Sequence, residues 1–218
     1  SLRDRPYFRH SDQLATYYLY VNTQKPALAD PRVRRALALA INRRELIDYV
    51  TLAGQEPALT LSPPSLYHGG LPDTPLHDAA FDEARALLAE AGYPGGRGLP
   101  PLTYLYNTME GHRKIAVVLQ ETWRRELGVN LVLENQEFKV TIDRRRAGDY
   151  DIARAGWVAD FKDPINFLEM FDSKSENNDS KWFDEHYDAM LAAARAEVDA
   201  DRRMQLLREA ELYLLENA

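Results

Sequence analysis

Cysteine is absent from the sequence, which excludes disulfide bonds and thiol chemistry. No apolar run approaches the length that crosses a bilayer, and the first residues lack the basic, apolar and small-residue regions of a signal peptide. Basic residues are outnumbered, 27 against 34 acidic ones, which gives a net charge of −7. The basic run at residues 144–146 is typical of a solvated helix face, so we expect no nucleic-acid partner.

Motifs of common catalytic sites are also missing. There is no G-x-G-x-x-G, no P-loop lysine motif and no G-x-S-x-G, and the five histidines lack the H-x-x-x-H spacing of a metal site. A hydrolase that uses Asp160 or Asp163 with His112 is an alternative, but it would have neither a nucleophile nor an oxyanion motif. We therefore expect that the protein is not an enzyme and that it uses no cofactor and no metal.

The composition is that of a globular protein, with 45% hydrophobic and 28% charged residues in 218. Segments rich in β-formers cover residues 17–22, 102–107 and 130–134, and another strand is expected after residue 148. Helices are expected to begin at the capping residues Asp30, Asn42, Asp78 and Asp199, and a further helix with a buried stripe ends at Gly128. This alternation predicts an α/β fold with a β-sheet flanked by helices.

The most informative segment is residues 153–164, A-R-A-G-W-V-A-D-F-K-D-P. It places a cation, Arg154, an aromatic, Trp157, and an anion, Asp160, at three-residue spacing in and beyond a predicted strand. Such a strand can bind another extended chain through its backbone, while the two charges hold the ends of a short peptide. The alternative is that both charges are ordinary strand-end ions and that Trp157 belongs to the core.

Several motifs, in their order, resemble the second lobe of periplasmic oligopeptide-binding proteins of ABC importers, which are bacterial extracellular solute-binding proteins of family 5. The motifs are Y-L-Y-V-N-T at 18–23, D-P-R-V-R-R-A-L at 30–37, A-I-N-R at 40–43, L-L-A-E-A-G-Y at 87–93, Y-N-T at 106–108, W-R-R-E-L-G-V at 123–129, N-Q-E at 135–137 and A-R-A-G-W at 153–157. The resemblance covers nearly the whole chain.

The resemblance implies that residues 1–218 form a single periplasmic-binding-protein-like lobe, with a mixed sheet, of a two-lobed receptor whose other lobe is absent from this chain. The missing signal segment and the abrupt ends agree with a dissected domain. The implied partners are short peptides, the missing first lobe and the permease subunits of an ABC importer. The implied location is periplasmic or extracellular, associated with the membrane.

Four charged or titratable residues gain a role from the resemblance. Asp160 matches the aspartate that pairs with the α-amino group of the peptide. Arg154, Arg145 and His112 match basic residues that meet the peptide carboxylate, depending on ligand length. The residues themselves leave alternatives: a structural salt bridge of Arg154 with Asp151 or Asp160, a solvated Arg145, and an exposed His112 at the start of a helix.

The remaining matches concern backbone and pocket walls. Gly156 and Val158 match positions whose backbone bonds to the peptide, and Trp157 and Phe138 match aromatic walls of side-chain pockets. Phe138 stands where a larger aromatic is expected and Val158 replaces a small residue, so the pocket shape departs from the family. Related receptors for dipeptides, murein peptides or nickel chelates are alternatives, with nickel the least favoured.

Overall fold

A computed structural model describes residue 5, residues 13–67, residue 70 and residues 74–218. Within these residues a four-stranded sheet has the order β1-β4-β2-β3. The strands are β1 (Ala15–Val21), β2 (Leu102–Asn107), β3 (Leu131–Gln136) and β4 (Ile152–Val158). β1 pairs antiparallel with β4, whereas β2 is parallel to both of its neighbours. The predicted α/β class with a mixed sheet is confirmed.

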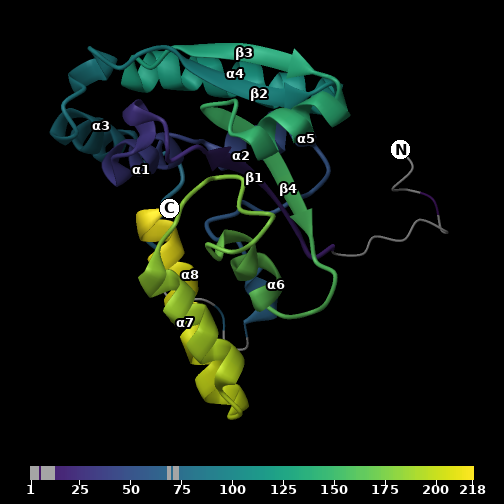
Figure 1. Ribbon diagram of the computed structural model, residues 1–218. Helices are drawn as coiled ribbons and strands as arrows, with labels where there is room; N and C mark the ends of the chain where they lie inside the picture. The colour runs from purple at the N-terminus through teal and green to yellow at the C-terminus, as the bar shows by residue number, and fades with distance from the viewer. Residues whose placement is uncertain (1–4, 6–12, 68–69, 71–73) are drawn as a thin grey trace.

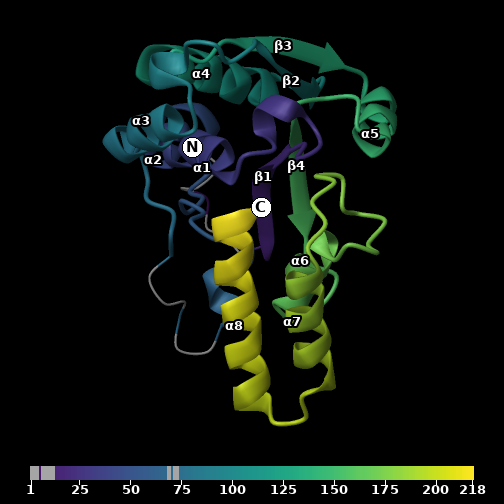
Figure 2. The same ribbon diagram turned by 60° about the vertical axis from the view of Figure 1, so that its left-hand side comes forward.

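Helices cover the sheet in two groups, above and below the long β1–β4 pair in Figures 1 and 2. The upper group consists of α1 (Pro31–Leu39), α2 (Arg43–Glu45), a π-helix (Leu46–Thr51), α3 (Phe81–Glu90), α4 (Glu110–Leu127) and α5 (Phe138–Ala147). The lower group consists of α6 (Ile165–Leu168) and the antiparallel hairpin α7 (Glu185–Ala196) and α8 (Ala200–Asn217). Short 3-10 turns lie at Pro26–Leu28, Pro64–Leu66, Pro94–Gly96 and Glu169–Phe171. Among the helices of the described residues, none is both long and apolar enough to cross a membrane.

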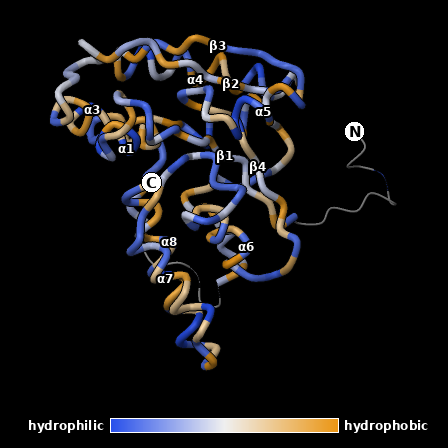
Figure 3. Tube along the Cα trace, viewed as in Figure 1, coloured by the Kyte–Doolittle hydropathy of each residue, from blue (hydrophilic) through white to orange (hydrophobic). Residues whose placement is uncertain are grey.

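Two hydrophobic clusters form the core, one on each face of the β1–β4 pair. Ile152 of β4 belongs to the upper cluster with α1, α3 and α4, and Ala153 and Ala155 belong to the lower cluster with α6, α7 and α8. This division follows from the strand period of two, which sends successive side chains to opposite faces. Figure 3 shows hydrophobic and hydrophilic residues alternating along the helices, as expected where one helix face is buried. Trp123, on the helix predicted to carry a buried stripe, lies in the upper cluster and is structural.

The predicted helix caps are confirmed except at Asp78. The side chains of Asp30, Asn42 and Asp199 accept backbone N–H bonds at the starts of α1, α2 and α8. Asp78 caps a different helix from the one predicted, because its carboxylate accepts the N–H groups of Arg43 and Arg44, at 2.6 and 3.1 Å. The chain turns after Asp78 and α3 begins only at Phe81, so the carboxylate faces the start of α2 instead.

The helix predicted to begin at Asn42 is not α-helical along its whole length. After one α-helical turn it continues as the π-helix Leu46–Thr51, and Leu52 ends it with a φ of 53°. Beyond it, the chain follows an irregular loop, of which residues 52–67, 70 and 74–80 are described. Its residues 61–67 are tied to α8 by Glu211, a fully buried carboxylate that accepts bonds from the backbone N–H groups of Leu61 and Ser62 and from the Tyr67 hydroxyl.

Candidate functional site

The centre of the candidate site is the edge of β4 that faces away from β1. All seven residues of β4 pair with β1, but only Ile152 and Ala153 pair with β2. Backbone bonds that flank the β1–β4 ladder, from Asn22 N–H to Asp151 C=O and from Ala159 N–H to Leu14 C=O, fix which residues bond to β1. In an antiparallel ladder, successive residues of a strand direct their N–H and C=O groups alternately toward the partner strand and away from it.

The alternation assigns each residue of β4 to one edge. Ala153, Ala155 and Trp157 direct their N–H and C=O groups to β1, and Arg154, Gly156 and Val158 direct theirs to the opposite edge. The pairing of β4 with β2 ends at Ala153 and Leu105, where the Arg154 N–H faces the Leu105 carbonyl, so the backbone groups of Gly156 and Val158 are the ones without a strand partner in the described part of the chain. The site therefore offers an open strand edge at the two residues predicted for backbone binding.

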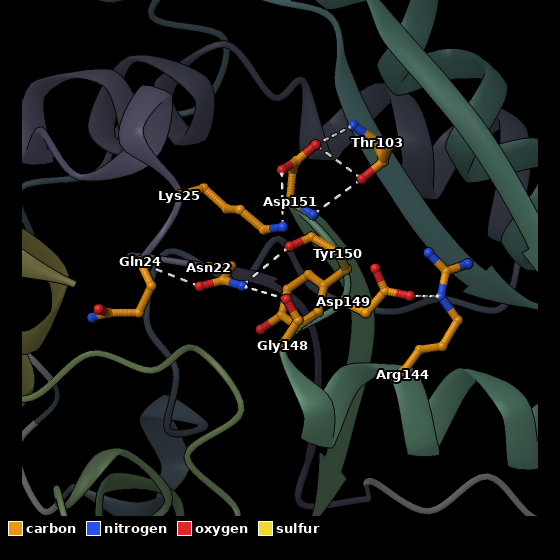
Figure 4. A network of polar contacts seen from close by, with 9 residues as sticks. All are labelled: Asn22, Gln24, Lys25, Thr103, Arg144, Gly148, Asp149, Tyr150 and Asp151. Atoms are coloured by element: carbon orange, nitrogen blue, oxygen red, sulfur yellow. Dashed lines mark hydrogen bonds and ion pairs between the residues drawn. The ribbon is translucent and has the colours of Figure 1, made fainter.

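The start of β4 is fixed by a polar network that Figure 4 shows. The carboxylate of Asp151 accepts the N–H and the hydroxyl of Thr103, at 2.8 and 2.9 Å, and lies 3.9 Å from the Lys25 ammonium. The side chain of Asn22 donates to the carbonyls of Gly148 and Tyr150 at 3.0 and 3.2 Å. This network uses the carboxylate of Asp151, so the alternative of an Asp151–Arg154 salt bridge is not formed.

Arg154 lies on an aromatic surface instead of against an acid. Its guanidinium carbon is 5.0 Å from the ring centre of Tyr17, and one terminal nitrogen is 3.5 Å from the Asn107 side-chain oxygen. The Nε atom is buried without a hydrogen-bond partner, and the ion pairs of the described residues do not include Arg154. Because this half-buried guanidinium has no acidic partner in the described part of the chain, its charge is available to an anion at the surface.

His112 lies close to Arg154 and is buried rather than exposed. It is 4% exposed in the first turn of α4, and its Nδ1 is 3.5 Å from the hydroxyl of Tyr17. Burial and, secondarily, the positive charge of Arg154 lower the pKa of His112 to about 4. At neutral pH the imidazole is therefore uncharged and can act as a hydrogen-bond donor or acceptor, but not as a cation.

Arg145 already has an acidic partner inside the fold. Its Nε is 2.5 Å from the carboxylate of Asp179, which is 3% exposed, and its guanidinium carbon is 5.2 Å from the ring centre of Tyr20. The neighbouring Arg144 pairs with Glu134 and Asp149, each at 2.7 Å. Two of the three arginines at 144–146 are thus paired with separate acids.

Asp160 follows the end of β4 and is exposed. No hydrogen bond or ion pair of its carboxylate is found within the described residues, while its backbone N–H donates to the Asn166 side-chain oxygen at 3.0 Å. The capping role at the start of α6 falls to Asp163, since its carboxylate accepts the Ile165 N–H at 2.9 Å. Asp160 is thus an accessible anion on a loop whose backbone is held in place.

The remaining predicted residues differ in how far they are exposed. Val158 and Phe138 are 54% and 58% exposed, and Phe138 is the first residue of α5. Trp157 is partly buried against the lower cluster, and its indole Nε1 donates to Asn166 at 3.0 Å. The structure thus brings Arg154 and His112 together and places Gly156, Trp157, Val158 and Asp160 on one continuous segment.

Sequence reasoning missed several residues that hold this site. Tyr17 and Asn107 both contact Arg154. Asn166 contacts Trp157, and Asp179 contacts Arg145. None lies within a recognisable spacing of its partner, because each contact joins elements that are distant along the chain or separated by an irregular loop. Only tertiary structure reveals these contacts.

Comparisons with known proteins agree with the fold. The sequence profile of the bacterial extracellular solute-binding proteins, family 5 Middle, matches residues 2–179. The murein peptide-binding protein MppA of Escherichia coli (strain K12) is 39% identical over 94% of this chain and 39% of its own length. The oligopeptide-binding protein OppA of Salmonella typhimurium is 38% identical over 92% of this chain and 38% of its own length. The chain thus spans about two fifths of the length of these relatives.

Solved structures show the same likeness. The unliganded open form of MppA superposes with a TM-score of 0.90 at 37% identity, covering 99% of this chain and 43% of that one. Haemophilus influenzae OppA in complex with the peptide RPPGFSPFR gives a TM-score of 0.84 at 34% identity, covering 94% of this chain and 41% of that one. The resemblance expected from the sequence is confirmed: the chain belongs to the bacterial extracellular solute-binding proteins of family 5, a family of binding proteins rather than enzymes.

Proposed function

We propose that the chain is the peptide-binding lobe of a two-lobed receptor that delivers short peptides to an ABC importer. The observation that carries the proposal is the open edge of β4, where Gly156 and Val158 can bond to an extended chain without regard to its side chains. Relatives named as oligopeptide-binding and murein peptide-binding proteins support this ligand class. The first lobe, the permease and a periplasmic location belong to the same proposal.

The charges at the two ends of the edge give the ligand a direction. Arg154 lies at the start of the open edge and Asp160 just beyond its end. A free peptide carries an ammonium and a carboxylate at neutral pH, and enclosing them is costly unless each is paired. With its amine at Asp160 and its carboxylate at Arg154, the peptide runs antiparallel to β4.

The same geometry limits the length of the ligand. From Arg154 to Val158 the strand spans about 13 Å at roughly 3.3 Å per residue, which matches a peptide of about four residues. Of the two arginines implied by the resemblance, Arg154 is the one without an acidic partner in the described structure. Arg145 would have to share its charge with Asp179, and neutral His112 would donate a hydrogen bond.

A murein peptide is the second candidate ligand. It is favoured by the likeness to MppA, at 39% identity and a TM-score of 0.90. A murein peptide, like other free peptides, carries charged ends, and the open edge of β4 serves it in the same way. A competition experiment that compares a murein tripeptide with an all-L tripeptide of equal length separates the two ligands by their relative affinity.

An NMR titration of the isolated chain with a free tetrapeptide tests the proposal. The control is the same peptide acetylated at its amine and amidated at its carboxylate. We expect fast-exchange shifts at Arg154, Gly156, Val158 and Asp160 with the free peptide, and much smaller shifts with the blocked one. One lobe offers half of the contacts, so we expect a dissociation constant of about 1 mM or weaker; a submicromolar value, or equal shifts with both peptides, would contradict the proposal.

A further inference from the structure

One buried side chain links the end of β4 to the loop that carries Asp160. Asn166, in α6, is 3% exposed, and its Oδ1 accepts two hydrogen bonds of 3.0 Å. One comes from the indole Nε1 of Trp157 and the other from the backbone N–H of Asp160. A single oxygen atom therefore fixes the orientation of the aromatic ring and the path of the backbone at the anion.

The helix that bears Asn166 is itself held firmly. Asp163, just before α6, forms a two-pronged ion pair with Arg203 of α8, at 2.7 and 3.1 Å. At the other end of α6, the hydroxyl of Tyr187 in α7 donates to the Leu168 carbonyl at 2.9 Å. Asn166 thus projects from a support fixed to both helices of the α7–α8 hairpin, which makes it a rigid anchor for its two donors.

Among the described residues, the Asp160 carboxylate has no such support of its own. Asp160 is exposed. Within the described residues, its hydrogen bond is the one that its backbone N–H donates to Asn166. A binding group must be held in a defined direction by its neighbours if it is to discriminate between ligands. The direction of this carboxylate therefore depends on the backbone bond to Asn166.

We propose that Asn166 is a positioning residue for the amine end of the site and sets the preference for peptides with a free α-amino group. It acts through Trp157 and Asp160, holding the pocket wall and the anion in fixed relation. This inference rests on the proposed function, because the preference exists only if peptides bind at β4. The inference gives a role in ligand specificity to a buried residue, which lies beneath the ligand-binding surface and does not touch the ligand.

Three substitutions separate positioning from stability. Asn166→Leu has a similar volume and removes the acceptor, whereas Asn166→Asp keeps an acceptor oxygen at the same place. Asn178→Leu is the matched control, because Asn178 is also buried, at 4% exposure, but donates to the carbonyls of Phe171, Asp172 and Trp182 instead. Should Asn166→Leu fail to fold, Asn166→Ser, whose hydroxyl is too short to serve both donors, replaces it.

The experiment measures the ratio of dissociation constants for an N-acetylated and a free tetrapeptide by NMR titration. An exposed ion pair gives the wild-type chain a ratio of up to about fivefold. We expect Asn166→Leu to bring the ratio close to one, and Asn166→Asp and Asn178→Leu to keep the wild-type ratio. A wild-type ratio in Asn166→Leu, or an equal loss in Asn178→Leu, would overturn the inference.

A measurement without ligand distinguishes this inference from the proposed function. Hydrogen exchange of the Trp157 indole N–H and the Asp160 amide should accelerate in Asn166→Leu and stay unchanged in Asn178→Leu. If exchange accelerates in Asn166→Leu alone but the wild-type chain does not respond to peptide, the proposed function is refuted, and with it the role of Asn166 in specificity. If the wild-type chain discriminates while exchange is unchanged in Asn166→Leu, only the positioning role is refuted.

Discussion

Replacement of His112 should change how the stability of the chain depends on pH. His112 is 4% exposed, and burial together with the charge of Arg154 lowers its pKa to about 4. In the unfolded chain the pKa of histidine is about 6.5. Between these two values the unfolded state binds a proton that the folded state does not, so the folded state loses stability as the pH falls from about 6.5 to about 4.

The size of this effect follows from the difference of about 2.5 pKa units. At 1.36 kcal/mol per unit, protonation of His112 in the unfolded state costs the fold about 3 kcal/mol when the pH reaches 4. Above pH 6.5 the imidazole is neutral in both states and contributes no pH dependence. In His112→Gln this contribution is absent, so the variant should gain stability relative to the wild type as the pH falls.

Urea unfolding of the wild-type chain, His112→Gln and His186→Gln at pH 7 and pH 4.5 measures the effect. His186 is exposed, which makes its replacement the matched control. The difference in the free energy of unfolding between wild type and His112→Gln should change by about 2–3 kcal/mol between the two pH values. Parallel pH curves for all three proteins, or a pKa of His112 near 6.5 by NMR, would refute the reasoning.

Three further predictions concern the edge of β4 and its surroundings. Gly156→Pro should preserve the fold but abolish the response to peptide, because it removes an N–H that faces the open edge. Ala155→Pro should instead unfold the chain, because it breaks a hydrogen bond to β1. Circular dichroism measures the fold of both variants, and peptide titration measures their binding. Asp160→Asn should lower the preference for a free over an N-acetylated peptide by up to about fivefold, measured by titration, with unchanged stability. Glu211→Ala leaves several buried donors without an acceptor, so urea unfolding should show a loss of about 3–5 kcal/mol.

Much of the fold could be predicted because its signals are local. The β-formers at residues 17–22 and 102–107 and the caps at Asp30 and Asn42 are signals carried by residues close together in the chain, and the structure confirms them. Asp78 shows the limit of this reasoning. Its carboxylate looked like a local cap, but it accepts bonds from residues 43 and 44, which a single sequence pattern cannot indicate.

The candidate site was predictable as a list of residues but not as an electrostatic arrangement. The spacing from Arg154 to Asp160 made this segment a candidate, and the resemblance gave its residues their expected roles. That Arg145 is neutralised by Asp179, and that His112 is buried and uncharged, depends on contacts across more than thirty residues of chain or on burial by other elements. Such effects arise only when the elements pack together.

The most direct test of the central claim is amide hydrogen exchange along β4 with and without a free tetrapeptide. If the peptide adds as a strand to the open edge, exchange should slow at Gly156 and Val158 and stay unchanged at Ala155 and Trp157, whose N–H groups already bond to β1. With the peptide at about ten times its dissociation constant, the slowing should reach about tenfold. Slowing at Ala155 and Trp157 instead, or no change anywhere on β4, would contradict the account.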